Sequence, residues 1–392
     1  MKPPPLAPRR RARWALLRNL ALFGVVVLAV VLGIQAAAGH RESAAHRESA
    51  ARSTPAPTVQ AWTGILIDRV TGRVLWSKSP DRRLGPASLT KVMTAILVLQ
   101  RTRDLDSSCK VPQMVDQEEL GNVVGLHAGE RITVRQALRA LIVKSANDAA
   151  VTLAYRVAGS EPAFVKLMNG KARALGLANT HFLNARGKPV PGHYSSARDL
   201  AKLGRYVMRN AEFRDLCRRK TATIRWPGHA VPVESHNRLL DYAWADGIKT
   251  GATAQTGACL IGSGQPGLWP LISVTLREPS RGQEKSDAVA LFTWGSALYE
   301  RRSIVSQGDV VATVPLAGGG HVTANAATPL TAVVRSAARV TTQLTLPASL
   351  DQAPQHGAEL GSVTYLADGQ KLGTVPLVAG VTATPSPGAS SR

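Results

Sequence analysis

The tetrapeptide Ser88-Leu89-Thr90-Lys91 stands directly before the apolar run Val92–Leu99. A helix that begins here places Ser88 and Lys91 one turn apart on the same face. The hydroxyl then lies at the helix N-terminus, where free backbone N–H groups and the helix dipole favour developing negative charge. A serine with a lysine as its base is suited to acyl transfer. Ser107–Lys110 has the same spacing, but it lies in a polar stretch with no apolar helix behind it.

Two further short motifs follow in a definite order. Ser145-Ala146-Asn147 falls at the predicted junction of two helices, and Lys249-Thr250-Gly251 falls on a predicted strand. Each motif is common by itself, and Ser235-His236-Asn237 is a second Ser-x-Asn. Their order and their settings, taken together with Ser88, indicate one catalytic constellation.

Charge and composition argue against several other classes of protein. The formal net charge is +22 in 392 residues, but the basic residues are scattered, and the aromatic residues (5%) do not interleave with them as a nucleic-acid platform requires. We therefore expect no nucleic-acid partner.

The nine histidines show no metal-ligand spacing, so we expect no metal and no cofactor. The chain has an odd number of cysteines, Cys109, Cys217 and Cys259, which favours buried free thiols. A single disulfide between two of them remains an alternative.

The N-terminus carries an export signal. Five arginines between Arg9 and Arg18 precede the apolar run Leu20–Ile34, and Ala36-Ala37-Ala38 offers the small residues of a cleavage site. Residues 1–38 are thus either a cleaved signal peptide or a retained anchor, because Leu20–Ala38 is also long enough to span a bilayer. Both alternatives place the rest of the chain outside the cytoplasm, in the periplasm or on the outer face of the cytoplasmic membrane.

The pattern along the chain predicts two folded domains. Residues 39–58 hold a tandem His-Arg-Glu-Ser-Ala-Ala repeat and two prolines, which indicates a polar tether. In residues 59–301 the pattern predicts a hairpin, a block of helices, further strands and a last helix. This order indicates an α+β domain with one antiparallel sheet and helices packed on it. Residues 302–380 read as a small all-β domain with an Asp-Gly hairpin turn, and residues 381–392 as a disordered tail.

The boundaries of the expected elements come from periodicity and capping signals. In the first domain we expect strands at Gln60–Asp68, Arg73–Lys78, Thr221–Trp226, Asp246–Ala252, Gly257–Gly262 and Leu268–Leu276, and helices at Ser88–Gln100, Thr133–Val143, Asn147–Val157, Ser160–Gly176, Ser196–Arg209 and Lys285–Glu300. In the second we expect strands at Val310–Pro315, Thr331–Arg335, Thr341–Pro347, Gly361–Leu366 and Leu372–Val378.

From Ala61 to about Val378 the chain resembles the penicillin-binding D-alanyl-D-alanine carboxypeptidases of low molecular mass. The segments that carry the resemblance are Pro86–Lys91, Ser145–Ala149, Ala174–Leu177, Tyr194–Asp199 and Gly247–Gly251. It implies a β-lactamase/transpeptidase-like domain followed by a small all-β domain. It also implies a serine-type carboxypeptidase that removes the terminal D-alanine from peptidoglycan pentapeptide stems in cell-wall synthesis and remodelling. Beta-lactam antibiotics are then expected as covalent inhibitors.

The resemblance assigns roles residue by residue. Ser88 is the nucleophile, Lys91 its base, and Ser145 a proton relay to the leaving amine. Asn147, Lys249, Thr250 and Gly251 bind the substrate, with Lys249 and Thr250 at its terminal carboxylate. The N–H groups of Ser88 and Ala252 form the oxyanion hole, and Arg277 is a candidate second partner of the carboxylate.

Three other functions remain open on the same residues. A DD-endopeptidase that cuts cross-links would use the same site, and a cell-wall binding protein could carry it inactive. A beta-lactamase usually adds a glutamate for deacylation, and the loop Tyr194–Asp199 has none.

Two segments depart from the family: Ala185–Lys188 replaces a His-Gly-Leu-like turn, and Thr382–Arg392 lacks the apolar face of a membrane-binding helix. Contact with the cytoplasmic membrane would therefore depend on residues 20–38.

Overall fold

The structure is a computed structural model, and it describes residues 55–383. The expected signal peptide or anchor, most of the tether and residues 384–392 lie outside the described residues. Within residues 55–383, no helix combines the length and the apolar character needed to cross a bilayer.

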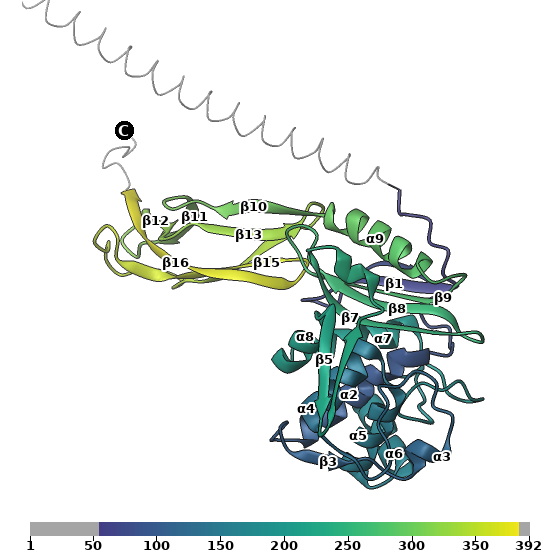
Figure 1. The fold of residues 1–392 in the computed structure, drawn as a ribbon. Coiled ribbons are helices and arrows are strands. Elements are labelled where there is room, and N and C mark those ends of the chain that lie inside the picture. The colour runs from purple at the N-terminus through teal and green to yellow at the C-terminus, as the bar shows by residue number, and fades with distance from the viewer. Residues whose placement is uncertain (1–54, 384–392) are drawn as a thin grey trace, which may run out of the picture. The chain divides into compact units, whose positions relative to one another are not determined.

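One five-stranded antiparallel sheet organises the first domain (Figure 1). Its order is β2-β1-β9-β8-β7, and the strands are β1 (Thr63–Asp68), β2 (Val74–Lys78), β7 (Ala245–Thr253), β8 (Gly257–Gly264) and β9 (Leu271–Glu278). The hairpin β1–β2 pairs through β1 with β9, which comes about two hundred residues later in the chain, so the two ends of the domain meet in one antiparallel sheet. Strand β7 is left at one edge.

The period of two along β1 explains why both faces of the sheet are covered. Ile65 and Ile67 point into the core formed with the helical block, whereas Leu66 packs into a second core with Leu291 and Phe292. Figure 1 accordingly shows α9 (Gln283–Ser296) on one face of the sheet and α2 and α7 on the other. The helices of the block are α2 (Lys91–Arg101), α3 (Met114–Gln117), α4 (Val134–Arg139), α5 (Asn147–Ala158), α6 (Glu161–Ala174), α7 (Ala197–Val207) and α8 (Ala211–Cys217).

Three helices of the block begin at a capping side chain. Thr133, Ser160 and Ser196 precede α4, α6 and α7, and each side chain accepts a hydrogen bond from the backbone N–H three residues later. The helix after Thr133 does not continue to Val143 as an α-helix, because residues 140–144 form a π-helical turn. Such turns are frequent at functional sites, and this one leads directly to Ser145.

Several elements differ from the sequence prediction. Thr221–Trp226 is strand β5, but it pairs with β6 (His229–Glu234) in a separate two-stranded sheet and does not join the main one. A second small sheet joins β3 (Ser108–Lys110) to β4 (Arg131–Thr133). The expected helix Lys285–Glu300 is too long, because α9 ends at Ser296 and the chain turns into β10 (Tyr299–Val305).

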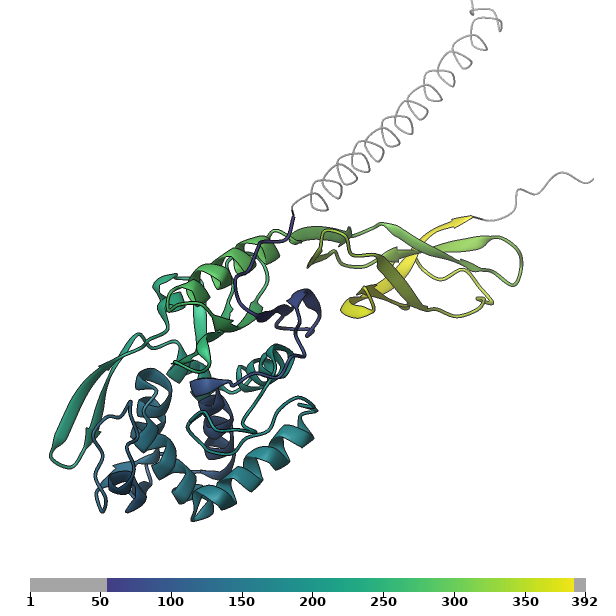
Figure 2. The ribbon, with the colours of Figure 1, turned by 90° about the vertical axis from the view of Figure 1, so that its right-hand side faces the viewer.

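The C-terminal part is an all-β unit, which confirms the expected class (Figure 2). The sheet order is β11-β12-β16-β15-β14, and β10 pairs with β13. The strands are β11 (Val310–Pro315), β12 (His321–Ala326), β13 (Leu330–Arg335), β14 (Val340–Thr345), β15 (Glu359–Ala367) and β16 (Gln370–Ala383).

The Asp-Gly turn between β15 and β16 is present, with positive φ at both residues, 48° at Asp368 and 81° at Gly369. Strand β16 extends beyond the expected end at Val378, because residues 382 and 383 pair with the unpredicted β12. Residues 381–383 are therefore strand and not tail.

Candidate active site

The Ser88–Lys91 pair forms as the sequence predicted, at the start of a helix. A 3₁₀ turn over Ala87–Thr90 runs into α2, and Ala87 itself has a positive φ of 47°. This strained turn exposes part of Ser88 and directs its hydroxyl toward Lys91, whose Nζ lies 2.9 Å from the Ser88 Oγ. The Lys91 side chain is completely buried.

The other two hydrogen bonds of Lys91 go to groups that can only accept. Nζ donates to the Asn147 side-chain oxygen (2.7 Å) and to the backbone oxygen of Arg186 (2.6 Å). A neutral amine has two N–H bonds and one lone pair. If the two acceptors take both N–H bonds, the lone pair faces the Ser88 hydroxyl, which is the arrangement that a general base needs.

The electrostatic surroundings favour that neutral amine. Burial lowers the pKa of Lys91 well below the ordinary lysine value, and the charges of Lys249 and Arg186 lower it further, while Asp148 opposes them. Burial and then the charge of Arg281 lower the pKa of Lys249 to about 7. Both amines thus titrate far below ordinary lysines.

The π-helical turn ends at Ser145 and leads into α5, whose first residue, Asn147, contacts Lys91. Ser145 is buried in the left-handed conformation (φ 63°) at the end of that turn, and α5 begins two residues later. Asn147 donates from its side-chain nitrogen to the Leu120 oxygen (2.5 Å), which fixes the amide with its oxygen toward Lys91.

Lys249, Thr250 and Gly251 lie on the edge strand β7, and all three are buried. The Lys249 Nζ donates to the Thr250 backbone oxygen at 2.8 Å. A Cβ at Gly251 would lie 2.8 Å from the Ser88 backbone nitrogen, closer than side chains tolerate. Glycine therefore allows β7 to pack against the nucleophile's own turn, a reason that the sequence did not supply. Ala252 follows on the same strand and is half-buried.

Arg277 does not join this group. Its guanidinium lies over the Trp62 ring, 3.9 Å from the centroid. The cause is a β-bulge, since two residues of β9 oppose Cys259 and Arg277 takes a positive φ of 59° there. Arg281, in the turn after β9, is the arginine whose charge acts on Lys249.

The rival serine is not in a comparable setting. Ser107 donates from its hydroxyl to the Asp104 backbone oxygen (2.6 Å), and Lys110 lies exposed on strand β3. Ser107 lies in the bend before β3 and Lys110 at the end of that strand, so the two do not lie one helical turn apart as Ser88 and Lys91 do.

Sequence reasoning missed the residues that hold the site together. Asp148 accepts from the backbone N–H groups of Val124, Gly125 and Leu126, each at 3.0 Å, and so fixes the loop beside Asn147. Asp148 does stand in the motif Ser145–Ala149, so a buried carboxylate directly after Asn147 was the available signal. A single asparagine, Asn122, braces the other side by donating to the oxygens of Lys144 (2.6 Å) and Ser145 (3.1 Å).

A glycine in the loop that departs from the family pattern also presses on the nucleophile. Gly187 has a φ of 87°, and a Cβ there would lie 1.9 Å from the Ala87 oxygen. Its neighbour Arg186 is buried, with its guanidinium on the Glu118 carboxylate (2.5 Å). The loop Ala185–Lys188 is thus part of the site.

No group of His, Cys, Asp and Glu within residues 55–383 is arranged to hold a metal ion. The thiols of Cys109, Cys217 and Cys259 are free and buried, and burial raises the pKa of each. They are inert structural residues.

Comparison with known proteins agrees with this geometry. The model of the D-alanyl-D-alanine carboxypeptidase family matches residues 49–280, and that of the penicillin-binding protein 5 C-terminal domain matches residues 299–384. The chain belongs to the D-alanyl-D-alanine carboxypeptidase family of serine peptidases. This confirms the resemblance drawn from the sequence. The family is penicillin-binding and acts on the peptidoglycan stem peptide, consistent with an extracytoplasmic location.

Individual relatives cover most of the chain. D-alanyl-D-alanine carboxypeptidase DacF of Bacillus subtilis is 30% identical over 336 residues, 82% of this chain and 85% of the relative. DacC of Escherichia coli is 35% identical over 266 residues, 64% of each chain. Among solved structures, penicillin binding protein 5 from Haemophilus influenzae has a TM-score of 0.62 at 27% identity and covers 85% of this chain and 100% of that one. The Streptomyces K15 DD-transpeptidase has a TM-score of 0.60 at 30% identity, covering 62% and 100%.

Proposed function

We propose that this protein is a serine D-alanyl-D-alanine carboxypeptidase that removes the terminal D-alanine from peptidoglycan pentapeptide stems through an acyl-enzyme on Ser88. The observation that carries the proposal is the buried Lys91 amine, 2.9 Å from the Ser88 hydroxyl and held by two acceptors on its other sides. The function of the named relatives supports the choice of substrate.

In the acylation step, Lys91 accepts the proton of the Ser88 hydroxyl while Oγ bonds to the carbonyl carbon between the two D-alanines. The N–H groups of Ser88 and Ala252 stabilise the oxyanion, and each such donor contributes about 3 kcal/mol. The C–N bond then breaks. The proton passes through Ser145 to the leaving amine, and D-alanine departs.

In the deacylation step, water adds to the ester carbonyl, and Lys91 takes one of its protons. The C–O bond to Ser88 breaks, the proton returns to Oγ, and the shortened stem peptide leaves. Every proton in both steps is carried by a side chain of this site or by water.

Substrate binding uses the edge strand. An extended peptide can lie along β7, where unpaired backbone groups are available at a sheet edge. Lys249 and Thr250 bind the terminal carboxylate, Asn147 holds a substrate amide, and the charge of Arg281 adds to the attraction.

The domain organisation completes the proposal. Residues 59–301 carry the catalytic site, and the second domain runs from residue 302 to the end of β16 at Ala383. Residues 1–38 export the chain and, if they are retained, hold it at the cytoplasmic membrane through residues 20–38. Residues 39–58 act as the tether.

The decisive experiment incubates the full chain with a muropeptide pentapeptide and follows free D-alanine. We expect release by the wild type and by Ser107→Ala, and none by Ser88→Ala. Cleavage of cross-linked dimers alone would indicate an endopeptidase, and rapid hydrolysis of a penicillin a beta-lactamase. Absence of all three reactions would indicate a binding protein with an inactive site.

A further inference from the structure

Helix α7 carries a stripe of positive charge. Arg198, Lys202, Arg205 and Arg209 follow one another at spacings of four, three and four, so they share one face of the helix and of the turn after it. Like charges one turn apart repel each other and destabilise a helix. Something other than helix stability must therefore account for this stripe.

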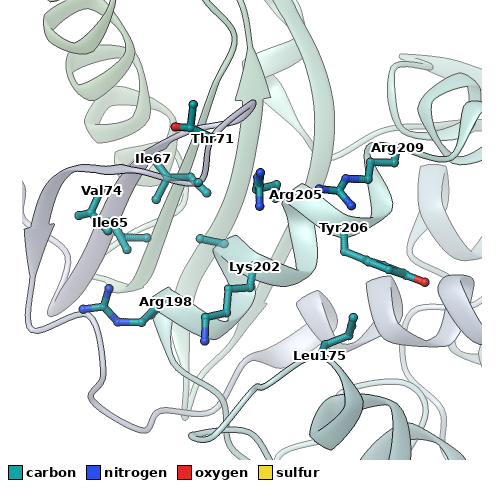
Figure 3. Close-up of a pocket in the computed structure, with 12 residues that line it drawn as sticks. Ile65, Ile67, Thr71, Val74, Leu175, Arg198, Lys202, Arg205, Tyr206 and Arg209 are labelled. Carbon is teal, nitrogen blue, oxygen red and sulfur yellow. The ribbon is translucent and has the colours of Figure 1, made fainter. Parts of the chain in front are cut away.

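The stripe lines a cavity of about 410 Å³ between α7 and the β1–β2 hairpin (Figure 3). Apolar residues from the hairpin and from the helical side form its floor: Ile65, Ile67, Val74, Leu175 and Ala201. The described lining contains no aspartate or glutamate. The hairpin lies at the sheet edge opposite β7, so the cavity is separate from the Ser88 site.

The cations of the stripe are only partly neutralised. Arg198 is bound by the Asp81 carboxylate (2.8 and 3.1 Å). Arg205 donates to the backbone oxygens of Arg69 and Val70, which orient its guanidinium but carry no net charge. The guanidinium of Arg209 makes no hydrogen bond or ion pair with any residue in 55–383.

The positive charge of Lys202 is balanced only weakly by its neighbours. Its Nζ donates to the Gly176 backbone oxygen at 2.8 Å, and the nearest carboxylate oxygen, on Asp199, is 4.0 Å away. The cavity therefore keeps a net positive charge, and Figure 3 shows Arg198, Lys202, Arg205 and Arg209 following one another along the same side of it.

We propose that this cavity binds a phosphate group, either free or carried by a phosphate ester such as a lipid headgroup. Guanidinium groups match the oxygens of a phosphate with two parallel hydrogen bonds, and a lysine adds a compact charge. The apolar floor can take the carbon part of the ester, and the volume is within the range of small-ligand sites. The net charge of +22 raises the local concentration of any such anion. The proposal does not depend on the function assigned to Ser88.

Isothermal titration calorimetry on the full chain tests the proposal with two probes. Inorganic pyrophosphate represents a free phosphate, and monomeric dihexanoylphosphatidylglycerol represents a lipid headgroup. We expect saturable binding of at least one probe by the wild type and at least tenfold weaker binding by Lys202→Ala/Arg209→Ala. Binding of the lipid alone identifies a headgroup site, and binding of pyrophosphate identifies a site for free or polymer phosphate.

A matched control removes the same charge elsewhere. Arg103→Ala/Lys110→Ala changes two exposed cations outside the cavity and should bind like the wild type. Arg209→Gln, which keeps a long polar side chain, replaces the double variant if that one unfolds, and circular dichroism reports folding. Absence of saturable binding by the wild type, or an equal loss in the control, would overturn the proposal.

Discussion

Gly251 packs directly against Ser88: a Cβ on Gly251 would lie 2.8 Å from the Ser88 backbone nitrogen and 3.1 Å from the Ala87 Cβ. That nitrogen belongs to the proposed oxyanion hole, and the strand that carries Gly251 also carries Lys249. The absence of a side chain thus sets the distance between the nucleophile and the groups that bind the substrate.

We predict that Gly251→Ala lowers the acylation rate by about 100-fold, because a shift of about 1 Å in catalytic geometry has effects of that size. The rate of covalent labelling by a fluorescent penicillin measures it. Gly170→Ala is the control, since a Cβ there meets nothing within 4 Å; its labelling rate should be unchanged and its helix more stable by up to ~1 kcal/mol. Wild-type labelling of Gly251→Ala would contradict the role given to this glycine.

The sequence could predict those parts of the fold and site that depend on local patterns. Ser88 and Lys91 share a face because an apolar helix follows them. Arg277 could not be placed in the same way, because its direction depends on a β-bulge that only the pairing of β8 with β9 creates.

Pairing over long distances explains the other differences too. The sequence of β12 carries no strong strand pattern, so this strand was not predicted. Without β12 the last residues of β16 have no pairing partner, and the sequence therefore predicted a tail there. Arg186 and Glu118 are 68 residues apart, so only the folded chain brings them together.

The Glu118–Arg186 ion pair joins two loops that orient the catalytic groups. The Arg186 oxygen accepts from Lys91, and the Leu120 oxygen, two residues after Glu118, accepts from Asn147. We predict that Glu118→Gln lowers kcat for D-alanine release about tenfold with little change in KM, because it loosens both oxygens but touches no substrate.

The neighbouring Glu119→Gln is the control for that substitution, because Glu119 is exposed and makes no ion pair within residues 55–383. It should leave kcat unchanged. A rise in KM alone for Glu118→Gln would show that the ion pair serves substrate binding and not the orientation of Lys91.

Lys249 should give the reaction an alkaline limit. Its pKa is lowered to about 7, first by burial and then by the charge of Arg281, so its positive charge is lost as the pH rises through 7. We predict that KM for a peptide with a free terminal carboxylate rises above about pH 7. Steady-state kinetics between pH 6 and 9 measure the effect.

Removing the charge of Arg281 separates this effect from other titrations. Arg281→Gln should move the rise in KM to higher pH, because one of the two causes of the lowered Lys249 pKa is gone. An unchanged pH profile in Arg281→Gln, or a KM that is flat over this range in the wild type, would exclude Lys249 as the carboxylate-binding group.

A buried carboxyl on strand β9 should make stability depend on pH. Glu278 is 1% exposed, and no cation forms an ion pair with its carboxylate among the described residues. Burial, and then the neighbouring Asp287, raise the pKa of Glu278 to about 8, whereas an unfolded glutamate ionises near its ordinary value of 4.5.

Between those two values the native state holds a proton that the unfolded state releases, so stability falls as the pH rises from about 4.5 to 8. Glu278→Gln removes this dependence, and we predict that it stabilises the fold by ~3 kcal/mol at pH 7. Thermal unfolding at pH 5, 7 and 8 tests it, with Glu119→Gln as the exposed control. If Tm of Glu278→Gln falls over this range as steeply as in the wild type, the dependence comes from other groups.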